Sequence, residues 1–436
     1  MGIQGPTTAE WFERAKSALV SGVSSGFRYW GDDDTLVIAR GDGAYMYDMD
    51  GNRYVDYQLG FGPVVLGHGH PAVAAAVAEA AASGTTFAMT TELEIEAAEA
   101  VRDAVSWIDT LRFTNTGTEA TMHAIRLARA HTGREVIVKF EGAYHGAHDY
   151  VLFSTSDAPL DNLGDRRSPI PYLESRGVPE AMQSLIRVVP YNDLEAMERL
   201  FREEGDQIAA MIVEPMLGNF LGVMPEDGYL SGLRRICDEY GTVLVFDEVK
   251  TGFRIALGGA EDVFGVVPDL GTFAKSMGNG FPIAAVAGRN EIIQDWAAGD
   301  IIQAGTYSGN IVGVAAAKAT IDILSTGEPF AAMERSGTAL RNGIEGILAE
   351  EGVPGHTVGH WSMFGISLSE EPPREYRDYV NHDEDLYGEV IMGMIRRGIF
   401  AVNDAREPFF LSAAHSAEDV ALTLEAFGDS LQEAKA

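Results

Sequence analysis

The chain has little cysteine, little lysine and no long apolar run. Cys237 is the only cysteine, which excludes an internal disulfide and is typical of the reducing cytoplasm. No stretch approaches the roughly 18 consecutive apolar residues of a membrane-spanning helix, so we expect no membrane partner. Lysine and arginine number 32 against 65 acidic residues, and the formal net charge is −33. Such a charge argues against nucleic acid as a partner, because phosphates need basic side chains.

The shortage of lysine narrows the search for a reactive amine. Lys275 lies in an apolar run among small residues, just before an expected strand. Burial lowers the pKa of a lysine and makes its neutral amine a usable nucleophile. Lys139 ends another strand-like run and Lys250 follows the turn at Asp247, and both could also line a cleft, so spacing alone leaves three candidates. The other lysines lie in expected helix surfaces or the tail, at Lys16, Lys318 and Lys435.

The order of apolar runs indicates an α/β fold. Between about residues 65 and 320, short β-rich runs alternate with alanine-rich stretches, which is typical of a parallel sheet covered by helices. The expected strands are 111–113, 136–139, 209–213, 242–246 and 282–287. The expected helices are 71–82, 119–131, 194–204 and 230–240. Asp-Gly turns around 44–57 predict an antiparallel hairpin or meander. The C-terminal 110 residues predict an α+β part, with a helix at 331–350, strands near 364–367 and 409–411, and a closing helix from 417.

Small and aromatic residues follow two of the expected strands, at the sheet edge where such folds bind ligands. Thr116, Gly117 and Thr118 form a loop that opens a helix, and free N–H groups there suit a phosphate. The same residues would also be found in an ordinary helix N-cap that binds no phosphate. Tyr144, which has glycines on both sides, could lie flat on a ring ligand or could simply be buried beside a turn. His145 has no carboxylate or thiolate cluster near it in sequence, so we expect no metal site.

Carboxylates end two further strands. Glu214 follows 209–213 and Asp247 follows 242–246. A buried carboxylate is costly unless it meets a cation, and a protonated pyridine nitrogen would be such a partner. A phosphate loop, a ring-stacking tyrosine, a strand-end aspartate and an enclosed lysine together meet the requirements of pyridoxal 5'-phosphate (PLP) chemistry.

Six motifs occur in a recognisable order, at 115–120, 144–146, 214–215, 246–254, 275 and 305–310. The set resembles class III (ω-type) PLP aminotransferases, in the branch of glutamate semialdehyde aminomutase and the β-amino-acid aminotransferases. The resemblance implies PLP fold type I and a homodimer with shared active sites. It also implies an N-terminal segment (1–60) that packs with the small domain, a large PLP-binding domain (61–325) and a small C-terminal domain (326–436).

The resemblance also implies roles for individual residues. Lys275 would hold PLP as a Schiff base and move the substrate's proton, and Asp247 would pair with the ring nitrogen. Thr306 would reach the phosphate from the neighbouring subunit. The other expected cofactor contacts are Thr116, Gly117, Thr118, Tyr144, His145, Glu214, Asn219 and Val249.

The expected substrate contacts bear on the reaction. They are Ser25, Arg28, Phe61, Arg406 and Glu407. Arg28 and Glu407 match aminomutase residues, and we predict that they form a pair that a substrate carboxylate opens.

Several departures from the mutase pattern point the other way. Phe61 stands where the mutase usually has Trp, Lys250 where it usually has Met, and 154–180 lacks the Gly-rich gating loop. The sequence therefore favours an aminotransferase that moves an amino group from an amino donor to a keto acid acceptor. Glutamate semialdehyde 2,1-aminomutase is the alternative, and a PLP decarboxylase, a racemase or a silent PLP binder are the remaining ones.

Overall fold

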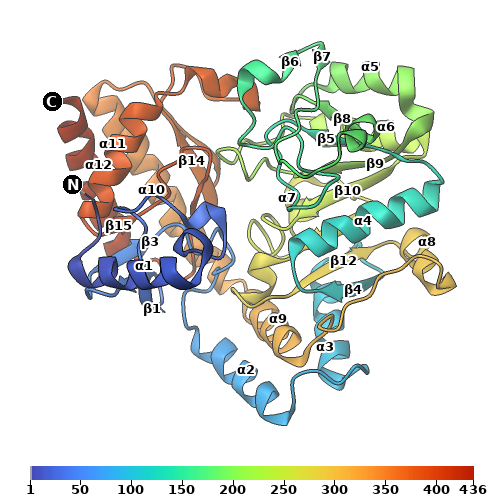
Figure 1. Ribbon diagram of the computed structural model, residues 1–436, viewed down its shortest axis with the longest axis horizontal. Coiled ribbons are helices and arrows are strands. Elements are labelled where there is room, and N and C mark those ends of the chain that lie inside the picture. Colours follow the sequence, from blue (N-terminus) through green and yellow to red (C-terminus); the bar gives the residue numbers. More distant parts are fainter. Residues whose placement is uncertain (1) are drawn as a thin grey trace.

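A seven-stranded sheet forms the middle layer of the larger part of the structure, a computed structural model that describes residues 2–436 (Figure 1). The strand order is β4-β12-β11-β10-β9-β5-β8. All neighbours pair in parallel except β12, which runs antiparallel to both β11 and β4. This confirms the predicted α/β fold with a mainly parallel sheet. The strands are β4 (Thr110–Thr114), β5 (Val136–Phe140), β8 (Ile186–Val189), β9 (Ile208–Val213), β10 (Val243–Glu248), β11 (Leu270–Phe273) and β12 (Ala284–Gly288).

Helices cover this sheet, and several of them begin at a residue whose side chain caps the first turn. In α4, the side chain of Thr116 accepts the Glu119 N–H, and Gly133 ends the helix in the left-handed conformation. Ala124 and Leu127 on one face of α4 are fully buried. The helices of this part are α2 (Pro71–Ser83), α3 (Glu92–Ala104), α4 (Gly117–Thr132), α5 (Leu194–Glu204), α6 (Tyr229–Tyr240), α7 (Ala260–Phe264), α8 (Asn290–Ile293) and α9 (Ile311–Leu324).

The two ends of the chain lie together on one side of the molecule (Figure 1). Strand β15 (Ile399–Phe400) pairs in parallel with β3 (Arg53–Asp56), so the C-terminal part completes a sheet that begins in the N-terminal segment. The domain boundaries at residues 60 and 325 stay a prediction. The other elements here are α1 (Pro6–Ala18), β1 (Ile38–Asp42), β2 (Tyr45–Asp48), α10 (Glu328–Glu351), β13 (His356–His360), β14 (Met363–Ser367), α11 (Glu384–Arg396), β16 (Phe409–Phe410) and α12 (Ala417–Lys435).

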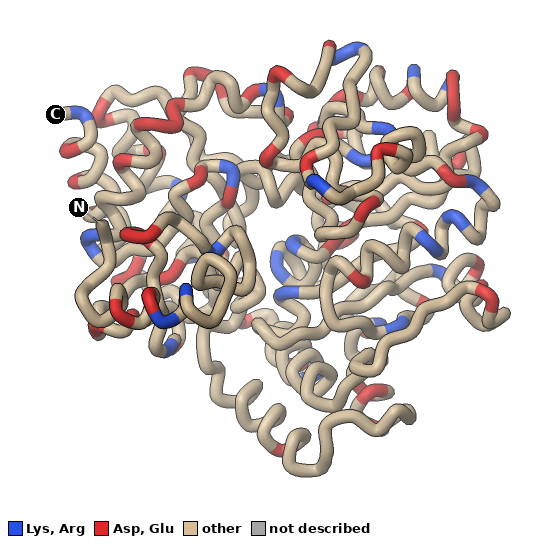
Figure 2. The backbone as a smooth tube through the Cα atoms, viewed as in Figure 1, with Lys and Arg blue, Asp and Glu red and all other residues tan. Residues whose placement is uncertain are grey.

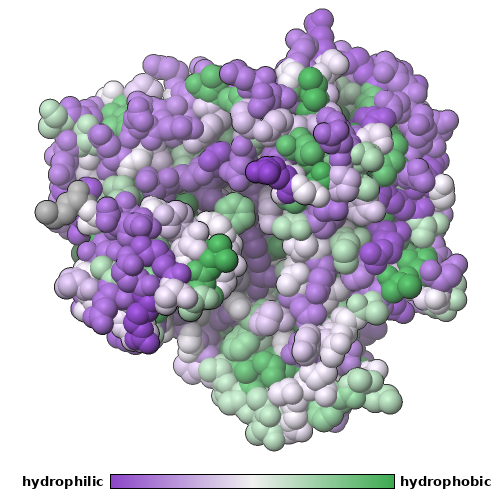
Figure 3. Space-filling model, in the orientation of Figure 1, coloured by the Kyte–Doolittle hydropathy of each residue, from purple (hydrophilic) through white to green (hydrophobic). Residues whose placement is uncertain are grey.

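The surface carries its acidic residues on both parts of the molecule rather than in one cluster (Figure 2). A hollow lies between the part with the chain ends and the part with the large sheet (Figure 3). Across residues 2–436, no helix is long and apolar enough to cross a membrane.

Candidate active site

A cavity of about 150 Å³ lies beyond the carboxyl ends of the parallel strands. Residues from the end of β10, from the loops after β5, β9, β10 and β11, and from the start of α4 converge on it. This is the position expected for a ligand site in such a sheet. The lining residues are Gly117, Thr118, Thr121, Tyr144, His145, Gly146, Glu214, Asn219, Asp247, Val249, Lys250 and Lys275.

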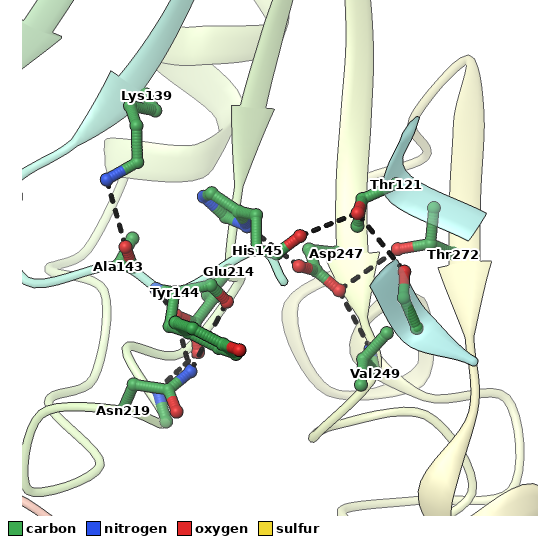
Figure 4. A network of polar contacts seen from close by, with 12 residues as sticks. Thr121, Lys139, Ala143, Tyr144, His145, Glu214, Asn219, Asp247, Val249 and Thr272 are labelled. Atoms are coloured by element: carbon green, nitrogen blue, oxygen red, sulfur yellow. Dashed lines mark hydrogen bonds and ion pairs between the residues drawn. The ribbon is translucent and has the colours of Figure 1, made fainter. Parts of the chain in front are cut away.

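Asp247 is a firmly held acidic group of the cavity. Its Oδ2 lies 2.7 Å from Nδ1 of His145, and its Oδ1 accepts hydrogen bonds from the Thr272 hydroxyl (3.0 Å) and the Val249 N–H (3.1 Å) (Figure 4). The carboxylate is almost fully buried. Three fixed contacts hold it in one orientation at the strand end, as a partner for a buried positive charge requires.

Glu214 organises the loops on the other side of the cavity. Its Oε1 accepts hydrogen bonds from the Tyr144 N–H and the Asn219 amide, both at 2.9 Å (Figure 4). Its Oε2 accepts the Gly218 N–H at 2.9 Å. Burial raises the pKa of Glu214, and the nearby His145 and Lys250 oppose that rise. Glu214 therefore fixes the backbone of Tyr144, a role that its strand-end position alone does not reveal.

The first turn of α4 leaves room for a ligand group at its backbone. A Cβ on Gly117 would meet both methyl groups of Val249 at 3.0 Å, and a Cβ on Gly146 would lie 2.6 Å from the Thr118 hydroxyl. Gly146 also has a φ of +100°, which only glycine adopts readily. Gly117, Thr118 and Gly146 line the cavity, and a helix N-terminus of this kind offers free N–H groups to an anion.

Lys275 stands in a strained backbone conformation at the start of the turn η6 (Lys275–Gly278), with a φ of +46°. Such a conformation costs energy in a non-glycine residue and is often found at functional sites. The side chain is half-buried because the cavity reaches it. Desolvation, followed by the charge of Lys250, lowers the pKa of Lys275 to about 7. Near neutral pH much of this amine is therefore uncharged and nucleophilic.

The lowered pKa predicts how the rate of cofactor attachment depends on pH. The uncharged amine reacts, and its fraction rises with pH, so the rate constant for adding PLP to the cofactor-free protein should rise through a midpoint near 7 and then level off. Stopped-flow absorbance measures this rate. A midpoint near the ordinary lysine value of 10.5 would contradict the prediction.

The structure separates the three candidate lysines. Lys250 and Lys275 line the cavity, whereas Lys139 does not. The Lys139 ammonium is fully buried and donates to backbone carbonyls, among them Ala143 at 2.9 Å (Figure 4). It therefore supports the loop before Tyr144 instead of facing a ligand.

The predicted Arg28–Glu407 pair is wrong. Glu407 pairs with Lys250, with 3.0 Å between the carboxylate and Nζ. The side chain of Arg28 is exposed, and within residues 2–436 it forms no ion pair. Lys250 is nearer because it lies two residues after the end of β10 and lines the inner cavity, whereas Arg28 lies on a short exposed turn. Arg406 is held by Asp404 through two contacts, at 2.8 and 2.7 Å.

An aromatic pocket lies next to the inner cavity, and sequence reasoning missed its central residue. The ring of Phe27 stands 6.1 Å from that of Tyr144 and 6.4 Å from that of Phe61, with edge-on geometry in both cases. Phe27, Phe61 and Glu407 line an outer cavity of about 300 Å³. The available signal was an aromatic residue directly before the predicted Arg28. Ser25 is half-buried and lines neither cavity, and Thr306 is exposed on a surface loop of this single chain.

Comparison with known proteins places this geometry in a family. The sequence pattern of the aminotransferase class-III family matches residues 29–411. The chain belongs to that family. Glutamate-1-semialdehyde 2,1-aminomutase of Methanothermobacter thermautotrophicus is 44% identical over 96% of this chain and 97% of its own. An omega-transaminase from Sphaerobacter thermophilus superposes with a TM-score of 0.94 at 35% identity, covering 99% and 98% of the two chains. A transaminase with PLP bound superposes with a TM-score of 0.88 at 27% identity, covering 99% of each chain.

PLP is the cofactor of this class-III enzyme, and the cavity fits it. The helix N-terminus kept open by Gly117 and Gly146 suits a phosphate, and the fixed carboxylate of Asp247 suits a protonated ring nitrogen. His145 Nε2 is buried and has no hydrogen-bond partner in the part of the chain that is described. A buried polar atom of this kind is costly unless a ligand or water meets it.

Proposed function

We propose that the chain is a glutamate-1-semialdehyde 2,1-aminomutase, which converts glutamate-1-semialdehyde into 5-aminolevulinate. The similarity to proteins of that name carries the proposal, because it extends from end to end at 44% identity. Further relatives at 40–41% identity have the same name. These relatives support the aminomutase better than the intermolecular aminotransferase, which the differences from the mutase sequence pattern favoured.

Substrate and product of the proposed reaction are isomers, so atoms balance without a second substrate. PLP supplies an electrophilic carbon for amines and a sink for the electron pair left when a C–H bond breaks. The amine Nζ of Lys275 would take the proton from one carbon and return it to another, as its lowered pKa allows. Asp247 would hold the positive charge of the ring nitrogen, and Tyr144, fixed through Glu214, would keep the ring in place.

An aminomutase must also keep its reacting partner in the site between two half-reactions. The segment 154–180, which lacks a Gly-rich gate, is held to the C-terminal part by several contacts. The Tyr376 hydroxyl donates to the Ser156 carbonyl at 2.9 Å, and Arg406 donates to the same carbonyl at 2.6 Å. We infer that this segment acts as a fixed wall in place of a moving gate.

The proposal predicts turnover without any acceptor. Purified holoenzyme given glutamate-1-semialdehyde alone should form 5-aminolevulinate at roughly 1 s⁻¹ or faster, a usual enzyme rate. Colorimetric measurement of 5-aminolevulinate, with and without an added keto acid, tests this. Product that appears only when a donor and a keto acid are both present would contradict the mutase and establish an aminotransferase.

The second candidate is that aminotransferase. The TM-score of 0.94 with an omega-transaminase favours it, as does Lys250 at a position where the mutase usually has Met.

We also propose a homodimer, in which Thr306 reaches the phosphate of the neighbouring subunit. The segment between α2 and α3 exposes Phe87 and Met89, which suits burial against a second copy. Sedimentation velocity measures the mass in solution, and a monomer would contradict this.

A further inference from the structure

Lys250 is a second lysine in the cofactor cavity. Its ammonium donates to the Gly218 carbonyl at 2.9 Å and to Glu407 Oε2 at 3.0 Å. A protonated lysine has three donors, so these two partners leave one N–H for a ligand. Lys250 thus carries a buried positive charge that is paired but not saturated.

The loop after β9 fixes the position of this side chain. A Cβ on Gly218 would come within 2.9 Å of Lys250 Cδ, so the glycine leaves the space that the lysine stem occupies. The N–H of Gly218 is bound to Glu214 at 2.9 Å. Gly218 therefore contacts both the carboxylate of Glu214, through its N–H, and the ammonium of Lys250, through its carbonyl.

The Lys250–Glu407 pair separates the two cavities. Lys250 lines the inner cavity with Lys275, whereas Glu407 lines the outer one with Phe27 and Phe61. The side chain of Lys250 is 4% exposed and that of Glu407 is 22% exposed. Glu407 can therefore turn toward water at low cost, but Lys250 cannot lose its partner without leaving a buried charge unpaired.

Other cations are not available to an anion in the inner cavity. Among residues 2–436, Lys250 and Lys275 are the only lysines or arginines that line it, and Lys275 is committed to the cofactor. Arg406 is occupied by Asp404, and Arg28 lies exposed outside both linings.

We propose that Lys250 binds the carboxylate of the substrate and that Glu407 is the internal carboxylate which this substrate displaces. The exchange keeps the buried ammonium paired throughout, so it costs little, and a simple amine would leave the pair closed. Lys250 is then a specificity-determining residue for substrates with a carboxylate. The inference extends the proposed function, whose substrate carries one carboxylate, but it holds equally for an amino-acid aminotransferase.

Pentanoate tests the proposal, because it offers a carboxylate without an amine or a carbonyl. Its dissociation constant is measured on the holoenzyme by calorimetry, and cofactor occupancy is measured from the visible absorption band. Lys250→Met should weaken pentanoate binding about ten- to a hundredfold, as expected for a lost charge-assisted contact. Lys250→Arg should keep most of the binding. Glu407→Gln should strengthen it at least about threefold, because the competing charge is gone. The surface variant Lys318→Met is the matched control and should bind as wild type does.

The proposal is overturned if wild type does not bind pentanoate, if Lys250→Met binds it normally, or if Arg28→Met loses it instead. If Lys250→Met does not fold or does not hold PLP, the variants Glu407→Gln and Lys250→Arg test the proposal instead. Unchanged or weaker pentanoate binding in Glu407→Gln would contradict the displacement of Glu407 by a carboxylate. The measurement is independent of turnover. If the aminomutase assay fails while pentanoate binding still depends on Lys250, only the proposed reaction is refuted, and the role of Lys250 stands.

Discussion

Lys275→Ala should abolish covalent attachment of PLP and lower turnover by roughly four orders of magnitude or more, because the variant loses both the nucleophile and the group that moves the proton. The protein should still fold and bind PLP non-covalently. The phosphate position at the start of α4 and the carboxylate of Asp247 do not depend on this side chain. Turnover assays, with the cofactor's absorption band, measure both effects.

Borohydride reduction followed by peptide mapping provides the control for this assignment. In the wild-type protein the reduced cofactor should be found on Lys275. Lys139 cannot compete, because its ammonium is enclosed by carbonyl oxygens, and Lys250 is held by Gly218 and Glu407. Label on either of those residues, or substantial turnover in Lys275→Ala, would contradict the role of Lys275. Lys318→Ala, on the surface of α9, should be labelled on Lys275 as the wild type is.

Much of the fold could be predicted because the signals for its helices and strands lie within each segment's own sequence. Helix α5 was predicted at its observed bounds, since Asp193 caps its start and its apolar face repeats at the helical period. Strand β11 was missed because it is short and contains Gly271, and a run of four residues gives little periodicity. The reversed direction of β12 has no local signal, since a strand's composition does not record which way its neighbours run.

The candidate site could be predicted where one residue type dictates the chemistry. The structure brings Asp247, Tyr144, Gly117 and Lys275 to one cavity, because each lies at or just after the end of a strand of the same sheet. The partner of Glu407 could not be predicted, because Lys250 and Glu407 are separated by 157 residues and meet only through tertiary packing. The one sequence signal was Lys250 itself, a charge at a position where the mutase usually has an apolar residue.

Asp247→Asn should lower turnover by about two to three orders of magnitude while leaving the site's shape intact. The asparagine oxygen can still accept from Thr272 and Val249, and its amide group can still face His145. A neutral amide, however, cannot offset a full positive charge on the ring nitrogen. The cofactor then becomes a weaker electron sink, and the step that breaks the C–H bond slows most.

Thr272→Val provides the matched control for this substitution. It removes one hydrogen bond to Asp247 Oδ1 but keeps the carboxylate and its contact with His145, so turnover should fall less than about tenfold. Single-turnover kinetics with the α-deuterated substrate distinguish the two variants. Asp247→Asn should show a larger isotope effect than wild type, because proton removal has become limiting, whereas Thr272→Val should not. A near-normal rate in Asp247→Asn would mean that the charge of Asp247 is not what the reaction uses, and that the carboxylate instead only orients His145.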